Sequence, residues 1–146
     1  MIVLAFVLSA ILLLITAAHV YWGIGGIWPG RDGASCARAV VGFRGVDAMP
    51  SSFACFAVAA CLCLVTLWPL ALEGVFATPF DHAGLAATAV MIGLAVLARG
   101  ILGFTPWWRR LAPEQPFARL DRRFYSPLCL LIAAGFLVLA FSAFPV

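Results

Sequence analysis

Four long apolar blocks alternate with shorter polar segments along this chain of 146 residues. The blocks cover residues 2–22, 52–72, 83–104 and 126–144. Each has the roughly 20 residues that a helix needs to cross a hydrocarbon layer of about 30 Å. The blocks lack the alternating pattern of barrel strands, and a helix satisfies its own backbone hydrogen bonds in lipid. The pattern therefore predicts an all-α fold, a bundle of four transmembrane helices in a single integral membrane domain over residues 1–146.

The composition excludes an ordinary soluble protein. Hydrophobic residues make up 65% of the chain and charged residues 10%, whereas soluble domains are about 25% charged. The first block resembles the apolar part of a signal peptide, but no positively charged residue precedes it. We therefore expect it to be a retained membrane helix.

The arginines predict an orientation in the membrane. Eight of the nine basic residues lie in two alternate loops, with Arg31, Arg38 and Arg44 in residues 23–51 and Arg109, Arg110, Arg119, Arg122 and Arg123 in residues 105–125. The loop between them carries no arginine or lysine, and its charged residues are the acids Glu73 and Asp81. Because positively charged loops stay in the cytoplasm, we expect a multi-pass protein of the bacterial inner membrane with both termini on the outer side. Membrane lipids are the expected partners, and the net charge of +3 requires no nucleic acid.

The chain also aligns with itself when it is shifted by 77 residues. Residues 23–29 (GIGGIWP) then lie over residues 100–106 (GILGFTP), and Pro50 lies over Pro127. This match favours a parallel duplication of a helical hairpin. The alternative is that similar helix ends arose independently, because glycine commonly ends a helix and proline commonly begins one.

Arg99 is the only basic residue inside an apolar block. It lies about 7 Å below the end of its helix at 1.5 Å per residue, where a charge is costly unless it reaches the headgroups, pairs or faces a wet cavity. Two interpretations stay open at this point. Arg99 extends to the headgroups, or it faces inward and binds an anion, with Asp47 and Asp121 as the expected counter-charges.

A histidine, a tryptophan, a tyrosine and a serine complete the predicted site. His19 and Trp22 are three residues apart and share a helix face, although an interfacial aromatic belt also explains a tryptophan there. A histidine inside a membrane helix tends to face the bundle interior, which makes His19 the candidate catalytic residue. The predicted ligand site is a cavity near the cytoplasmic side, lined by His19, Trp22, Arg99, Tyr125 and Ser126.

The remaining histidine and the cysteines do not indicate a cofactor. His19 and His82 are expected at opposite sides of the membrane, so they cannot both bind one haem iron. The five cysteines form no Cys-x-x-Cys motif, and Cys61 and Cys63 point in different directions from one helix. We expect no metal, no cofactor and free, mostly buried thiols.

Three motifs carry a resemblance to a known family. They are His19-x-Tyr21-Trp22-x-x-Gly25-Gly26-x-Trp28-Pro29, Arg99-Gly100-x-x-Gly103-Phe104 and Arg123-Phe124-Tyr125-Ser126-Pro127-Leu128-Cys129. On these motifs the chain resembles a family of small bacterial integral membrane proteins of unassigned function. The resemblance implies a four-helix membrane fold and transfers no catalytic residue.

Three functions remain open from the sequence. The leading hypothesis is a protein that binds a lipid-like or amphipathic anionic ligand. The first alternative is a membrane-embedded enzyme acting on a lipid or isoprenoid-type substrate, with His19 as acid or base and Arg99 stabilising negative charge. The second is an accessory or structural subunit, as a homo-oligomer or within a larger membrane complex. No recognisable catalytic motif decides between them.

Overall fold

The computed structural model describes residues 1–143 and contains four long helices. They are α1 (Ile2–Gly23), α3 (Ser52–Leu72), α4 (His82–Leu102) and α7 (Ser126–Ser142). All four are long and apolar enough to cross a membrane, and the described residues contain no strand. The predicted all-α fold with four membrane helices is therefore confirmed. The expected end of the fourth helix at residue 144 lies outside the described residues.

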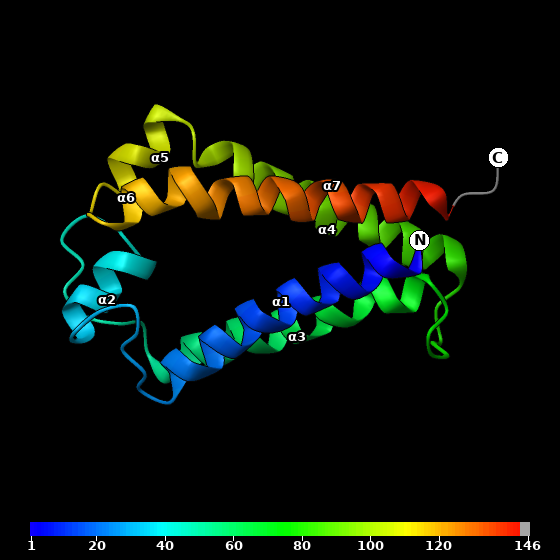
Figure 1. Ribbon diagram of the computed structural model, residues 1–146, viewed down its shortest axis with the longest axis horizontal. Coiled ribbons are helices and arrows are strands. Elements are labelled where there is room, and N and C mark those ends of the chain that lie inside the picture. Colours follow the sequence, from blue (N-terminus) through cyan, green and yellow to red (C-terminus); the bar gives the residue numbers. More distant parts are fainter. Residues whose placement is uncertain (144–146) are drawn as a thin grey trace.

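The helices form two hairpins that run in the same direction (Figure 1). Helix α1 packs along α3, and α4 packs along α7, while contacts between the hairpins are far fewer. Glycines allow the close packing of the second hairpin, because a Cβ atom on Gly100 would lie 2.6 Å from Leu130 Cδ2. The arrangement is the parallel one expected of a duplication, and the duplication itself stays a prediction.

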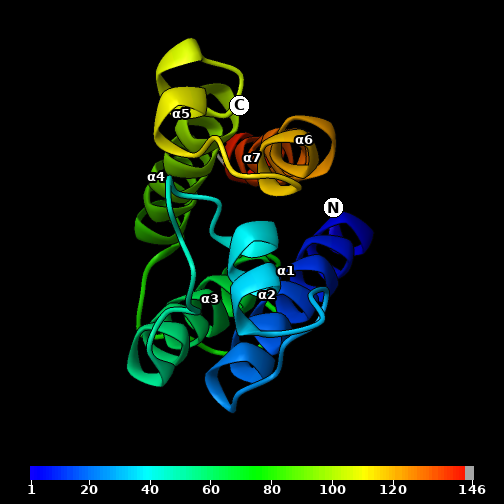
Figure 2. The ribbon, with the colours of Figure 1, turned by 90° about the vertical axis from the view of Figure 1, so that its left-hand side faces the viewer.

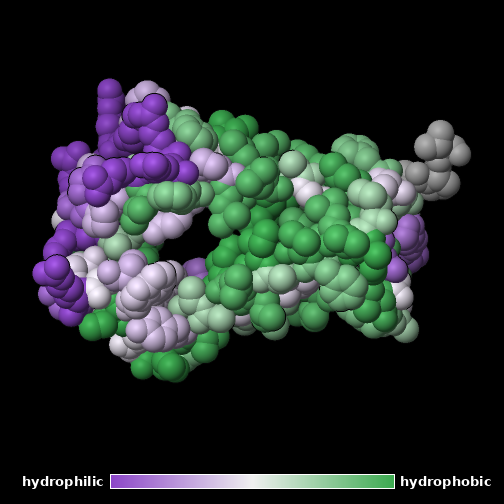
Figure 3. Space-filling model, viewed as in Figure 1, coloured by the Kyte–Doolittle hydropathy of each residue, from purple (hydrophilic) through white to green (hydrophobic). Residues whose placement is uncertain are grey.

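The long helices of the two hairpins pack together at one end of the bundle, whereas at the other end the contacts between the hairpins are made by the loops. The buried core joins the first half of α1, the last turn of α3, the start of α4 and the end of α7, through Ala5, Leu8, Leu12, Leu72, Leu85, Ala89, Phe136 and Leu139 among others. Gly135 permits this contact, because a Cβ atom there would lie 2.7 Å from Leu8 Cδ2. Towards the opposite end the hairpins diverge, and the space-filling view shows an opening between them (Figure 3).

The long loops at the diverging end are partly helical. The first loop contains α2 (Gly33–Val40). Its N-cap is Asp32, whose Oδ1 accepts a 2.7 Å hydrogen bond from the Ser35 backbone N–H. That bond lowers the pKa of the Asp32 carboxyl, and the Ser35 hydroxyl lowers it further. The loop is thus locally fixed at the start of α2.

The second loop contains α5 (Pro106–Leu111), α6 (Phe117–Leu120) and a π-helical turn, η1 (Asp121–Tyr125). Figure 2 looks onto this end and shows α2, α5 and α6 grouped over the ends of the hairpins. Helices α6, η1 and α7 form one continuous helix over Phe117–Ser142. The fourth helix therefore begins nine residues earlier than its apolar block, because its first turns carry arginines that the hydropathy pattern excludes.

Charge is distributed unevenly between the two ends. All nine arginines lie at the diverging end, in the loops or in the last turn of α4, together with the acids Asp32, Asp47, Glu114 and Asp121. The hydrophilic surface in Figure 3 gathers at that end. The joined end carries Glu73, which lies 3.4 Å from the amino terminus of Met1, and Asp81, which caps α4.

Candidate functional site

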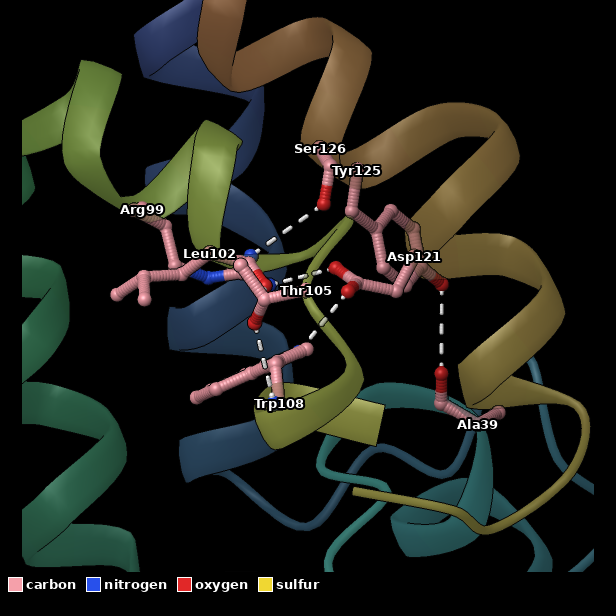
Figure 4. Close-up of polar contacts among 8 residues, drawn as sticks. All are labelled: Ala39, Arg99, Leu102, Thr105, Trp108, Asp121, Tyr125 and Ser126. Atoms are coloured by element: carbon pink, nitrogen blue, oxygen red, sulfur yellow. Dashed lines mark hydrogen bonds and ion pairs between the residues drawn. The ribbon is translucent and has the colours of Figure 1, made fainter. Parts of the chain in front are cut away.

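An ion pair between Arg99 and Asp121 lies where α4 meets η1 (Figure 4). Arg99 Nη2 donates to Asp121 Oδ1 at 2.6 Å. The indole Nε1 of Trp108 donates to the other carboxylate oxygen, Oδ2, at 3.0 Å, and the Arg99 guanidinium lies 4.7 Å from the centre of the Trp108 ring. Arg99 Nη1 also lies 3.4 Å from Ser126 Oγ. Arg99 of α4 and Trp108 of α5 therefore meet at the buried carboxylate of Asp121 in η1.

Local structure explains how these side chains converge. Thr105 caps α5, because its hydroxyl accepts from the Trp108 backbone N–H at 3.2 Å, and Pro106 occupies the first turn. This places Trp108 beside α4. Gly103 allows η1 to approach, because a Cβ atom there would overlap Ser126 Oγ and would lie 2.9 Å from Asp121 Oδ2.

The ion pair decides between the two interpretations of Arg99. The Asp121 side chain is 3% exposed and the Arg99 side chain 33%. Arg99 therefore faces inward with an acid of the same chain as its partner, as the second interpretation expects. Asp47, the other expected counter-charge, is exposed and forms no ion pair within residues 1–143. The ion pair balances the Arg99 charge and joins η1 to α4.

Tyr125 and Ser126 connect this cluster to the rest of the loop end. Tyr125 extends towards the first loop, where its hydroxyl donates to the Ala39 carbonyl of α2 at 3.4 Å. Its ring lies 5.8 Å from that of Phe117. Ser126 is fully buried beside Arg99. The pair belongs to the junction between the two loops.

His19 and Trp22 lie on the other hairpin, near the end of α1. Their rings meet edge to face with centroids 5.1 Å apart, and Trp22 Nε1 donates to the Trp28 carbonyl at 2.7 Å. His19 Nδ1 lies 2.8 Å from the Ile15 carbonyl oxygen. Because a carbonyl only accepts, Nδ1 donates this hydrogen bond. Within residues 1–143 no group bonds to Nε2.

A cavity of about 240 Å³ lies beside these two rings. It is lined by His19, Trp22, Val40, Val41, Met49, Pro50, Ala54, Cys55 and Val58. We call it the His19 pocket. Its walls come from α1, the end of α2, the segment before α3 and the first turns of α3.

The structure thus separates the predicted site into two groups. His19 and Trp22 line the His19 pocket, whereas Arg99, Asp121 and Ser126 form the ion-pair cluster, and no member of that cluster lines the pocket. The two groups lie apart because the hairpins diverge towards this end. The position of each residue along its own helix does not predict that divergence.

Two parts of the site escape sequence reasoning. Trp108 fits an interfacial anchor by composition, and only the fold brings its indole to Asp121. The pocket residues Met49 and Cys55 carry no motif.

The cysteines are free, as expected, but only Cys36 and Cys55 are buried, whereas Cys61 and Cys63 are exposed on α3. Burial raises the pKa of the Cys36 thiol in α2. Within residues 1–143 no three His, Cys, Asp or Glu side chains gather as metal ligands.

Comparison with known proteins gives one match. No characterised protein and no solved structure shows significant similarity to the chain. A family model, described as a protein of unknown function (DUF3995), matches residues 12–136. This region includes the ion-pair cluster and the whole His19 pocket. The chain therefore belongs to the DUF3995 family of proteins of unknown function.

Proposed function

We propose that the protein binds an amphipathic, lipid-like anionic ligand at the diverging end of the bundle. The His19 pocket receives an apolar segment of the ligand, and the arginine-rich loops attract its anionic part. The single observation that carries this proposal is the pocket itself, a largely apolar cavity with the His19 imidazole in its wall.

The size and chemistry of the pocket fit part of an amphipath. Its volume of about 240 Å³ is below the roughly 300–1,000 Å³ of pockets that enclose a drug-sized molecule. It therefore accommodates a segment such as a chain or a hydroxyl-bearing linker. A hydroxyl group suits His19, because a hydroxyl both donates and accepts hydrogen bonds with an imidazole.

The charges at this end support an anionic ligand. This end carries nine arginines and four carboxylates, and one of the carboxylates, Asp121, is already paired with Arg99. The excess positive charge attracts anionic headgroups and directs them to the loops. In this proposal residues 23–51 and 105–125 are cytoplasmic loops of an inner-membrane protein, and both termini lie outside.

The enzyme alternative requires His19 and Arg99 to act on one substrate. Their placement in separate clusters, with Arg99 bound to Asp121, argues against that pairing. An accessory role, as a homo-oligomer or in a larger complex, stays a prediction that the oligomeric state tests.

Native mass spectrometry of the detergent-purified protein tests the proposal. Ala54 lines the pocket, whereas Ala60 is exposed on the same helix. Ala54→Phe is expected to lower the number of co-purifying lipids in the spectrum, and Ala60→Phe is expected to keep the number found for the wild type. Equal lipid occupancy in both variants contradicts the proposal, and the same spectra report the oligomeric state.

A further inference from the structure

A second, open cavity of about 520 Å³ lies on the other hairpin, between α5 and the helix formed by α6 and η1. It is lined by Arg109, Gln115, Ala118, Arg119, Arg122 and Arg123. We call it the arginine pocket. It shares no residue with the His19 pocket or with the ion-pair cluster.

One face of a helix supplies most of this pocket. Residues 115, 118, 119, 122 and 123 recur at intervals of three, one, three and one, which places them along one side of the α6–η1 helix and the turn before it. Ala118 leaves the middle of that face without a bulky side chain. Arg109 completes the pocket from α5.

The opposite face of the same helix holds the arginines in place. Phe117 and Asp121, four residues apart, are buried against the rest of the loop end. Asp121 is fixed by Arg99 and Trp108. The helix therefore cannot rotate without breaking a buried ion pair, and Arg119, Arg122 and Arg123 stay directed away from the core.

The four guanidinium groups have no balancing charge in the described structure. Within residues 1–143 none of them lies within 4.0 Å of a carboxylate, and no acid lines the pocket. Arg109 Nη2 donates to the Phe104 carbonyl at 3.0 Å. Each guanidinium has five N–H donors, so most donors in the pocket are free for a ligand.

We propose that the arginine pocket binds a phosphate group. Guanidinium groups bind phosphate through paired hydrogen bonds, and several of them around one concavity match the charge and the oxygens of a phosphate better than those of a single carboxylate. The pocket lies at the end of the span Phe117–Ser142, and Trp107, in the same short helix as Arg109, is 59% exposed. Tryptophan gathers at the headgroup level, so the phosphate of an anionic phospholipid is within reach, and a soluble phosphate is the other source of the same chemistry.

The test is a titration of the purified full-length protein in detergent, followed by native mass spectrometry. The probes are a short-chain phosphatidylglycerol, a short-chain phosphatidylcholine and inorganic phosphate. Arg119→Gln/Arg122→Gln removes two charges from the pocket. The matched control, Arg31→Gln/Arg38→Gln, removes two charges from the first loop at the same end. Arg119→Lys/Arg122→Lys keeps the charge but loses the guanidinium fork.

Arg119→Gln/Arg122→Gln is expected to bind phosphatidylglycerol about tenfold more weakly than the wild type. The control variant should change the affinity about twofold. The lysine variant should lose an intermediate amount of affinity. Competition by millimolar inorganic phosphate assigns a phosphate site that is also open to soluble phosphates. Tight phosphatidylglycerol binding without such competition assigns the lipid headgroup. Equal losses in the pocket variant and the control overturn the proposal, because they show a diffuse charge effect.

Discussion

Arg99 Nη2 lies 2.6 Å from Asp121 Oδ1 and joins the last turn of α4 to the π-helical turn η1. Asp121 is nearly inaccessible, and its second oxygen accepts from the Trp108 indole at 3.0 Å. One carboxylate thus fixes α4, α5 and η1 together. The same contact fixes the orientation of the α6–η1 helix, so that Arg119, Arg122 and Arg123 point outward. The ion pair therefore helps to form the arginine pocket, although neither of its residues lines that pocket.

Removing the cation should destabilise the loop end. Arg99→Gln leaves a buried carboxylate with Trp108 as its remaining partner, which is expected to lower the free energy of unfolding by about 1–3 kcal/mol. The value is modest because a third of the Arg99 side chain is exposed. Thermal unfolding in detergent, followed by circular dichroism, measures the change.

The double variant Arg99→Met/Asp121→Leu separates the ion pair from packing. Replacing both partners removes the unpaired charge, so it should recover much of the stability that the single variant loses. A double variant that is less stable than Arg99→Gln would show that the pair itself stabilises the fold.

Gly103 should tolerate no side chain. A Cβ atom there would overlap Ser126 Oγ and would crowd Asp121, so Gly103→Ala is expected to destabilise the protein by about 1–3 kcal/mol. The control is Gly33→Ala in the first turn of α2, where an added Cβ atom meets no other atom within 4 Å. The same thermal unfolding experiment compares them, and equal melting temperatures would contradict the close approach of η1 to α4.

The buried thiol of Cys36 should make stability depend on high pH. Burial raises its pKa above the usual value of 9.0, so the folded protein keeps the proton when the unfolded chain loses it. Folding is then favoured fully below pH 9.0 and is weakened as the pH rises further. Unfolding curves between pH 7 and pH 10 should fall more steeply for the wild type than for Cys36→Ala, and parallel curves would refute the effect.

The charge distribution predicts the topology of the chain. Reporter fusions at either terminus should be active on the outer side, and fusions within residues 23–51 should be active in the cytoplasm. Fusions that place both termini in the cytoplasm would reverse the assigned orientation, and with it the membrane leaflet that faces the arginine pocket.

The sequence predicts the four long helices, but it does not predict how the site residues are grouped. Residues 52–72 match α3 at both ends, because a run of about 20 apolar residues in lipid has few alternatives to a helix. The fourth helix was predicted too short, because Arg119, Arg122 and Arg123 interrupt its hydropathy while leaving its helical spacing intact.

The separation of His19 from Arg99 could not be predicted, because it depends on how the two hairpins pack. Both residues lie near the same end of their helices, which made one shared cavity the simplest interpretation. Small residues such as Ala5, Ala86 and Gly135 join the hairpins at the opposite end, and the long helices diverge towards the loops. Of the two expected counter-charges of Arg99, Asp121 forms the ion pair. Asp47 is exposed and forms no ion pair in the part of the chain that the structure covers.

Photo-crosslinking of an anionic lipid tests most directly whether the His19 pocket binds a lipid-like ligand. The protein is reconstituted with a phosphatidylglycerol that carries a diazirine in its acyl chain, and the modified peptides are mapped after irradiation. The proposed function predicts adducts concentrated on the pocket segments, at residues such as Met49 and Val58, and their loss in Ala54→Phe. Adducts spread evenly over lipid-exposed residues such as Leu13 and Leu14, unchanged by that substitution, would contradict it.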